Sequence, residues 1–167
     1  MKNKIFLCVC ISMLLFSCKK KEETVVTNDE VEVIEQDLIV SNIGVQLSKD
    51  AAKELESWGE YQMVQPILDS YTSITKGRAL ENAKNLSDLV EGMKDSEYPE
   101  IIKRDDVIIR ISVLLNHALR LHDMRTISSI SDEEVETEIG KLLAAYSSLN
   151  DKINAVFQIE QYERKYQ

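Results

Sequence analysis

The 167-residue chain is acidic, with 29 Asp and Glu residues against 20 Lys and Arg residues and a formal net charge of −9. This balance argues against a protein that binds nucleic acid or an anionic lipid surface through charge. The length fits a single domain, and the chain contains no long internal repeat.

The first residues have the form of an export signal. Lys2 and Lys4 precede an almost wholly apolar run over residues 5–16. This run of about 12 residues is too short for a membrane-spanning helix, which needs roughly 20. Because a basic start followed by a short apolar run is typical of secretory signals, we expect residues 1–17 to be a signal peptide.

The end of this run is Leu15-Phe16-Ser17-Cys18, with a large aliphatic residue three places before the cysteine and a small residue directly before it. This pattern resembles the lipobox of bacterial lipoproteins. The resemblance implies that the chain is cut before Cys18, which then carries a thioether-linked diacylglycerol and an acyl chain such as palmitate on its new amino group. A single lipid chain binds a membrane only marginally, at about 0.8 kcal/mol per buried CH₂, so two or three chains on one residue anchor a domain firmly. An uncleaved anchor with an unmodified Cys18 thiol is the alternative.

A short charged stretch follows the cysteine. Lys20 and Lys21 precede Glu22 and Glu23, and this order resembles the basic-then-acidic signal with which some Gram-negative lipoproteins reach the outer face of the outer membrane. Together the resemblances imply a protein held by its lipid in the bacterial outer membrane, on the periplasmic or the cell-surface face. They identify an export pathway and leave the family of the domain open.

The mature chain that this processing leaves contains no thiol. Cys8 and Cys10 lie in the signal and Cys18 carries the lipid, so stability must come from packing and not from disulfides. The loss of Lys2 and Lys4 leaves 18 basic against 29 acidic residues, so the net charge falls to −11.

Residues 18–47 are expected to be the lipidated cysteine and a disordered acidic linker. Residues 22–37 include seven acidic side chains and no basic one, and like charges extend a linker. Residues 31–35 alternate as in a short strand, but we expect no partner strand for them. Residues 38–47 are ambiguous, because they are apolar enough to dock on the domain.

Residues 48–167 carry the pattern of a helical domain. Apolar residues recur at steps of three and four, which predicts an all-α fold, best formed as an antiparallel four-helix bundle, with five or six shorter helices as the alternative. Ser48 is expected to cap the first helix, which should break or kink near residues 64–66 because proline clashes with an unbroken helix. The other helices are expected over residues 76–93, over 99–125, and from the capping box Ser131-Asp132-Glu133-Glu134 to the chain end.

The third of these helices is the most apolar. A narrow stripe of Ile102, Ile109 and Val113 lies roughly opposite its broad apolar face. Apolar residues on both sides predict a helix that is buried between neighbours or covered by another subunit. The broad face consists of Val107, Ile108, Ile111, Leu114, Leu115, Ala118 and Leu121.

Aromatic residues mark a second candidate interface, since they are favoured at the hot spots of protein interfaces. Tyr162 and Tyr166 share one face near the end of the fourth helix, where a partner or a second copy can pack; the alternative is that they cover the bundle's own end. With Ile109 and Val113 they form our set of candidate interface residues. The aromatic residues expected to be exposed are Trp58, Tyr61, Tyr71, Tyr98, Tyr162 and Tyr166.

The sequence contains no recognisable catalytic centre. It has no glycine-rich phosphate loop and no Gly-x-Ser-x-Gly element, so we expect no enzymatic activity. The Glu-x-x-His pattern of di-iron bundles is absent, because leucines stand three places before His117 and His122. We expect no metal and no cofactor.

His122 is a candidate for a ligand site. It falls within the apolar face of the third helix, where a core histidine satisfied by a hydrogen bond is the simplest interpretation. The alternative is a ligand in the bundle interior, with haem held by His122 and Met63 or Met93 as the most specific version.

These patterns predict a lipid-anchored cell-envelope protein with a helical protein-interaction or scaffolding domain and no catalytic activity. Its partner would be another envelope protein or a second copy. The alternative is a carrier of a small ligand, metal or haem that uses the bundle interior around His122.

Overall fold

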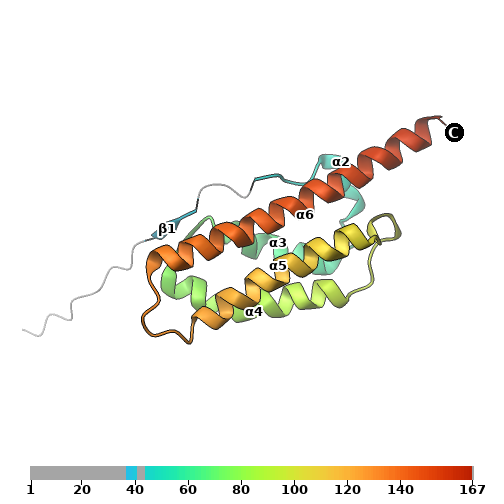
Figure 1. The fold of residues 1–167 in the computed structure, drawn as a ribbon. Helices are drawn as coiled ribbons and strands as arrows, with labels where there is room; N and C mark the ends of the chain where they lie inside the picture. The colour runs from blue at the N-terminus through green and yellow to red at the C-terminus, as the bar shows by residue number, and fades with distance from the viewer. Residues whose placement is uncertain (1–36, 41–43, 167) are drawn as a thin grey trace, which may run out of the picture. The chain divides into compact units, whose positions relative to one another are not determined.

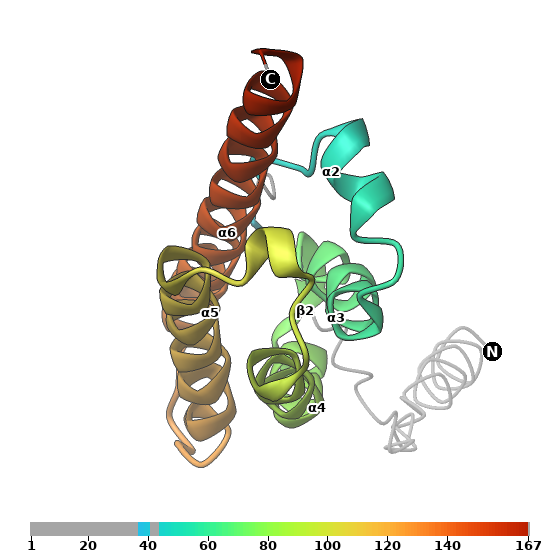
Figure 2. The same ribbon diagram turned by 90° about the vertical axis from the view of Figure 1, so that its right-hand side faces the viewer.

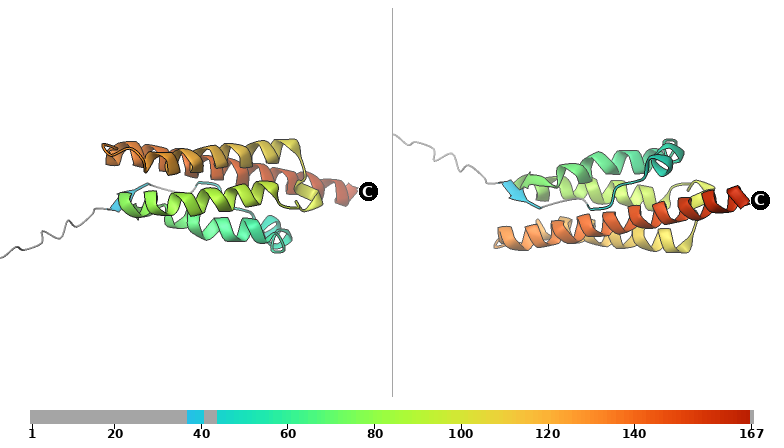
Figure 3. Two further views of the ribbon diagram at one scale, coloured as in Figure 1. Left: turned by 90° about the horizontal axis from the view of Figure 1, so that it is seen from below. Right: turned by 90° about the horizontal axis from the view of Figure 1, so that it is seen from above.

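Four helices pack side by side in the computed structural model, which describes residues 37–40 and 44–166 (Figure 1). Successive helices run in opposite directions, and α5 packs against both α4 and α6 (Figure 3). The predicted all-α fold and its antiparallel four-helix bundle are confirmed. The four helices are α3 (Gly59–Ser70), α4 (Lys76–Asp95), α5 (Asp105–Met124) and α6 (Asp132–Tyr166).

The buried faces of these helices meet in one core. Figure 2 views the bundle from one end, with α4 and α5 strongly foreshortened and α6 beside α5. Helix α4 confirms the predicted stripe, because its buried apolar residues alternate steps of four and three. Within the described ranges, none of the helices is both long enough and apolar enough to cross a membrane. The apolar residues that α4 buries are Ala79, Ala83, Leu86, Val90 and Met93.

The first predicted helix is divided at a different place from the one expected. A short helix, α2 (Lys49–Glu54), follows Ser48, whose Oγ accepts the Ala51 amide at 3.2 Å and so confirms the predicted cap. The chain then turns over residues 55–58, and Pro66 lies inside α3. The predicted break near Pro66 is therefore wrong.

Packing explains where the break falls. Leu55 and Trp58 are both buried, and the turn between α2 and α3 brings both side chains into the core. Proline removes one backbone hydrogen bond from α3, but buried residues on both sides of it, Val64 and Leu68, hold that helix against the bundle.

Helix α5 begins later than predicted. Pro99 precedes a short 3₁₀ helix, η2 (Glu100–Ile102), and Arg104 has an extended backbone (φ −135°, ψ 141°) before α5 starts at Asp105. Ile102 is buried, so it does not belong to the outer stripe of α5 to which the pattern assigned it. The broad core face is confirmed, except that Ile108 is only half-buried.

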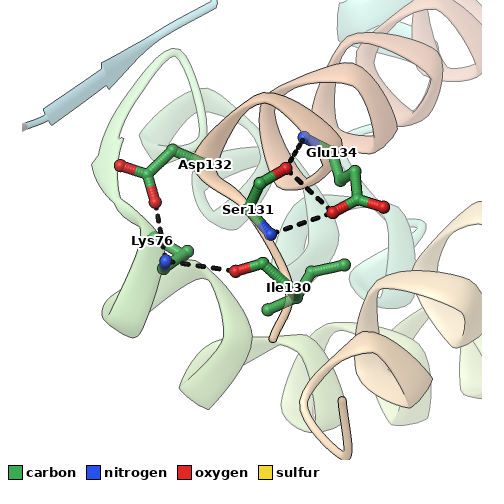
Figure 4. Close-up of polar contacts among 5 residues, drawn as sticks. All are labelled: Lys76, Ile130, Ser131, Asp132 and Glu134. Carbon is green, nitrogen blue, oxygen red and sulfur yellow. Dashed lines mark hydrogen bonds and ion pairs between the residues drawn. The ribbon is translucent and has the colours of Figure 1, made fainter. Parts of the chain in front are cut away.

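Helix α6 has 35 residues and is about 52 Å long at 1.5 Å per residue. Ser131 Oγ accepts the Glu134 amide at 3.2 Å, and Glu134 Oε2 accepts the Ser131 amide at 2.9 Å (Figure 4). The predicted capping box is confirmed. Beside it, Lys76 Nζ lies 2.6 Å from Asp132 Oδ1, which joins the start of α4 to the start of α6 (Figure 4).

Replacing Ser131 by alanine should lower the free energy of unfolding by about 1 kcal/mol, because the Glu134 amide loses its acceptor and Glu134 loses the hydroxyl donor. Urea unfolding followed by circular dichroism measures the change. Ser129→Ala, in the exposed turn before the helix, is the matched control and should change stability by less than about 0.5 kcal/mol. Equal effects of the two substitutions would contradict the capping role.

The segment before α2 is folded onto the bundle. Strand β1 (Asp37–Ile39) pairs antiparallel with β2 (Ser73–Thr75), and Leu38 lies opposite Ile74 with both side chains buried. The expectation of a disordered linker is therefore wrong for residues 37–39. The predicted strand at residues 31–35 lies outside the described residues.

Residues 44–48, here called the strap, lie along α6. Ser147 Oγ accepts the Val45 amide at 2.8 Å, and the Asn154 side chain donates to Gln46 O and accepts from the Ser48 amide, both at 2.8 Å. Gly44 has φ +76°, and a Cβ there would clash with the Ser147 side chain, so glycine permits the close approach. Thus residues 37–40 and 44–47, within the predicted linker, pack on the bundle, which is the docking that their apolar content allowed.

Candidate functional site

Glu138 is a buried carboxylate that joins α6 to α5. Its side chain is only 2 % exposed. His117 Nδ1 lies 2.8 Å and Arg120 Nε 3.2 Å from Glu138 Oε1, while Lys141 Nζ lies 3.4 Å from Oε2. Because a buried charge is costly unless it is paired, these partners on the two helices are what permit a carboxylate at this position.

The cluster keeps Glu138 ionised. Burial by itself would raise the pKa of Glu138, but the hydrogen bond with His117 and the positive charge of Arg120 outweigh it and hold this pKa below its usual range. An ionised Glu138 paired with His117 and Arg120 of α5 therefore joins α6 to α5.

Glu138→Gln should lower the free energy of unfolding by about 1–2 kcal/mol at neutral pH, because the ion pairs of Glu138 with Arg120 and Lys141 are lost. The loss stays this small because Arg120 and Lys141 are partly exposed and return to water. The folded pKa of Glu138 is below the unfolded value of about 4.3. Its contribution is thus complete above that pH and is lost as the pH falls through the folded pKa. Urea unfolding measured from pH 7 downward should show that the difference in free energy of unfolding between the unsubstituted chain and the Glu138→Gln chain becomes smaller in acid.

The control for this substitution is Glu136→Gln, on the exposed side of the same helix. It should change stability by less than about 0.5 kcal/mol at neutral pH. A difference between the Glu138→Gln and unsubstituted chains that stays constant from pH 7 to strongly acid solution would contradict the assignment of an ionised, stabilising carboxylate.

The outer face of α5 exposes apolar side chains beside this cluster. Ile109 is 60 % and Val113 is 41 % exposed. They share a stripe of α5 with three exposed polar residues, because the five positions are separated by steps of four, four, three and four. Both candidate residues are therefore on the surface, and the interface that they were predicted to form stays a prediction. The α5 stripe consists of Asp105, Ile109, Val113, Asn116 and Arg120.

The end of α6 carries a second exposed group. Ile159, Tyr162 and Tyr166 are exposed, and the two tyrosine rings lie 4.5 Å apart. Helix α6 continues beyond the ends of α4 and α5 (Figure 1, Figure 3). The alternative that these tyrosines cover the bundle's own end is therefore wrong.

His122 is not the satisfied core histidine that the pattern favoured. It is half-buried, and its Nδ1 has no hydrogen-bond partner among the described residues. Met93 is near the last turn of α4 and Met63 near the start of α3. In the antiparallel bundle both lie at the opposite end from His122, so neither can share a haem with it. In the described part of the chain, no three His, Cys, Asp or Glu residues gather as a metal site.

Most of the aromatic residues expected to be exposed are in the core. Trp58, Tyr61 and Tyr71 are buried and Tyr98 is half-buried, so that expectation is wrong for these four. Their polar atoms find partners inside the protein: Trp58 Nε1 donates to Ser96 Oγ at 2.9 Å, and Tyr71 Oη donates to Ala79 O at 3.0 Å. Because its polar atom has a hydrogen-bond partner, each of these aromatic side chains is buried without leaving an unpaired donor.

A buried chain of hydrogen bonds connects α3, α6 and the strap. Asn150 Nδ2 donates to Val45 O at 3.0 Å, so its Oδ1 faces Tyr61, whose hydroxyl donates to it at 2.7 Å. The Tyr61 hydrogen is thereby used, and Tyr146 must donate to Tyr61 across the 2.8 Å between their hydroxyls. Burial raises the pKa of both Tyr61 and Tyr146, so both phenols keep the protons that this chain requires.

The predicted export and lipid signals lie outside the described residues. They comprise the signal peptide at residues 1–17, the lipidation site Cys18, and the charged stretch of Lys20, Lys21, Glu22 and Glu23. They stay predictions.

Sequence reasoning missed the buried polar residues Glu138 and Asn150. A signal for each was present. Glu138 follows Val135 by three places and precedes Leu142 by four, and Asn150 follows Tyr146 by four, so both stand within the apolar stripe of α6. A polar residue within a core stripe indicates a buried partner, although not which one.

Comparison of the chain with protein-family models, with curated proteins and with solved structures finds no match.

Proposed function

We propose that this protein is a lipid-anchored component of the bacterial outer membrane whose helical domain binds another protein and has no catalytic role. The observation that carries the proposal is the exposure of Ile109 and Val113 at the middle of α5, whose other faces pack on α4 and α6. Exposed apolar side chains that gather on one surface mark interaction sites more often than those that stand singly.

The rigidity of this surface favours binding. Ile109 and Val113 stand one turn apart on a 20-residue helix that is packed along its length, so little conformational entropy is lost when a partner orders them. The tyrosines at the end of α6 offer a second contact of a kind that is enriched at interface hot spots.

Support for the anchor comes from the sequence. Leu15, Phe16, Ser17 and Cys18 match the lipobox pattern, and two or three lipid chains on one residue hold a domain at a membrane. A domain anchored in this way needs no further membrane contact, which agrees with the acidic charge of the chain.

Site-specific photo-crosslinking in cells tests the binding function. A photoreactive phenylalanine analogue in place of Ile109, and separately of Tyr162, should form a covalent adduct when cells that produce the full chain are illuminated. The same analogue at Asn85, exposed on α4, is the matched control and should form none. Failure at both Ile109 and Tyr162, or equal labelling at Asn85, would overturn the proposal.

Fractionation tests the anchor separately. Cys18→Ala should release the protein from the membrane fraction, and mass spectrometry of the native chain should find a lipidated cysteine as its first residue. An intact leader, or equal membrane association of the Cys18→Ala chain, would remove the anchor while leaving the binding function to the crosslinking experiment.

A further inference from the structure

We propose that the α5 stripe binds the same stripe of a second copy, so that two chains pair antiparallel about a two-fold axis that crosses α5 between Ser112 and Val113. The inference rests on the proposed binding function and names the partner. In this arrangement each residue of the stripe meets its counterpart counted from the other end: Asp105 faces Arg120, and Ile109 faces Asn116.

The stripe is apolar at its centre and charged at its ends. Val113 lies next to the proposed axis, with Ile109 on one side of it and the uncharged Asn116 on the other. Asp105 and Arg120 stand fifteen residues apart, which is about 22 Å along the helix. An apolar centre with a polar rim is the arrangement found in specific protein interfaces.

The two charged ends are opposite in sign. A two-fold axis at the midpoint places Asp105 of each copy against Arg120 of the other, so one pairing forms two ion pairs at once. A parallel pairing would instead place like charges together, which costs several kcal/mol at an interface. The stripe is thus complementary to itself in one orientation, as an interface between identical copies requires.

Both charged residues are available for this contact. Asp105 is exposed and makes no ion pair within the described residues, unlike its neighbour Asp106, which pairs with Lys152 at 2.5 Å. Arg120 is 67 % exposed and approaches Glu138 through Nε. Because a guanidinium has five N–H donors, its outer edge remains for a carboxylate of the second copy while Glu138 fixes its position.

Net charge also bears on the choice of partner. Two copies of the mature chain, each with a net charge of −11, repel one another over most of their surfaces. On the α5 stripe the charges of Asp105 and Arg120 balance, so this is a surface on which two such chains can approach without that repulsion. The charge pattern therefore permits a second copy to bind at this stripe despite the acidic charge of the chain.

Cysteine crosslinking in cells that produce the full chain tests the proposal. Val113→Cys, treated with a short bismaleimide, should give a band at twice the mass of the chain, because the two Val113 positions lie next to the axis. Asn85→Cys on the exposed side of α4 is the matched control and should give none. A Val113→Cys chain that stays monomeric would overturn the proposal.

Charge substitutions at Asp105 test the orientation. In the Val113→Cys background, Asp105→Asn should reduce the crosslinked fraction, and Asp105→Lys, which faces Arg120 with a like charge, should reduce it about tenfold or more. Unchanged helix content and melting temperature in both variants show that the bundle is intact. Equal crosslinking in all three chains would overturn the self-complementary pairing.

The photo-crosslinked adduct at Ile109 separates this inference from the proposed function. An adduct at twice the mass of the chain supports the second copy as the partner. An adduct of any other mass overturns the homodimer and leaves the binding function standing. The absence of adducts at both Ile109 and Tyr162 overturns both.

Discussion

Replacing Trp58 by alanine should lower the free energy of unfolding by about 3–5 kcal/mol, the largest loss expected from a single substitution in this protein. Trp58 is 2 % exposed and lies at the turn between α2 and α3. Its ring stacks on Tyr61 at a centroid distance of 5.5 Å, and Nε1 donates to Ser96 Oγ beyond the end of α4. The substitution leaves a cavity among these groups and removes the donor of Ser96.

Circular dichroism during urea unfolding measures this loss, since Trp58 is the chain's single tryptophan and fluorescence disappears with it. Met63→Ala, on the exposed side of the same region of α3, is the matched control and should change stability by less than about 0.5 kcal/mol. A loss below about 1 kcal/mol for Trp58→Ala would show that the α2–α3 turn is not part of the cooperative core.

Replacing Asn150 by alanine should lower the free energy of unfolding by about 2–4 kcal/mol. Asn150 is fully buried, and its amide connects the Tyr61 hydroxyl on α3 to Val45 O in the strap. Without it, the buried Tyr61 hydroxyl loses its acceptor and Val45 O loses a donor. The buried Tyr61 hydroxyl left without its acceptor costs about 1–3 kcal/mol, and the lost hydrogen bond to Val45 O of the exposed strap costs about 1 kcal/mol more.

Asp151→Ala, at the next position on the exposed side of α6, is the control for Asn150→Ala and should be nearly neutral. Hydrogen exchange gives a second measurement. The Val45 amide, in the strap, donates to Ser147 Oγ of α6, and it should exchange faster when Asn150 is lost. Unchanged exchange at Val45, with unchanged stability, would contradict the role of Asn150 as the connection between core and strap.

The helical elements were the most predictable part of this protein. The stripe of α4 from Ala79 to Met93 was readable because helix periodicity is a local property of the sequence. The capping box of Ser131 and Glu134 was readable for the same reason, since the two residues stand three places apart. The predicted break at Pro66 was wrong because the rule that proline disrupts a helix considers only the local sequence. Buried residues on both sides of Pro66 hold α3 against the bundle.

The candidate site was predictable only in part. The pattern placed Ile109 and Val113 opposite the broad face of α5, but it left open whether a neighbouring helix or another subunit covers them. The structure shows that none of the described helices buries these two residues. The pairing of Glu138 with His117 was not predictable, because it depends on how α5 and α6 are rotated against each other. Burial of Trp58 and Tyr61 was missed for a similar reason: whether an aromatic side chain is inside depends on a partner for its polar atom, and Ser96 lies 38 residues from Trp58.

By itself, the sequence determined the all-α class, the order of the helices after residue 48 and the capping of α2 and α6, because each depends on residues within one or two turns of each other. The tertiary structure alone decided that the strap docks on α6 and that Glu138 and Asn150 lie in the interior. These features depend on contacts between distant residues, such as Asn150 and Val45, 105 positions apart. A polar side chain is stable in the core only when such a contact forms, and no local pattern specifies which residue will make it.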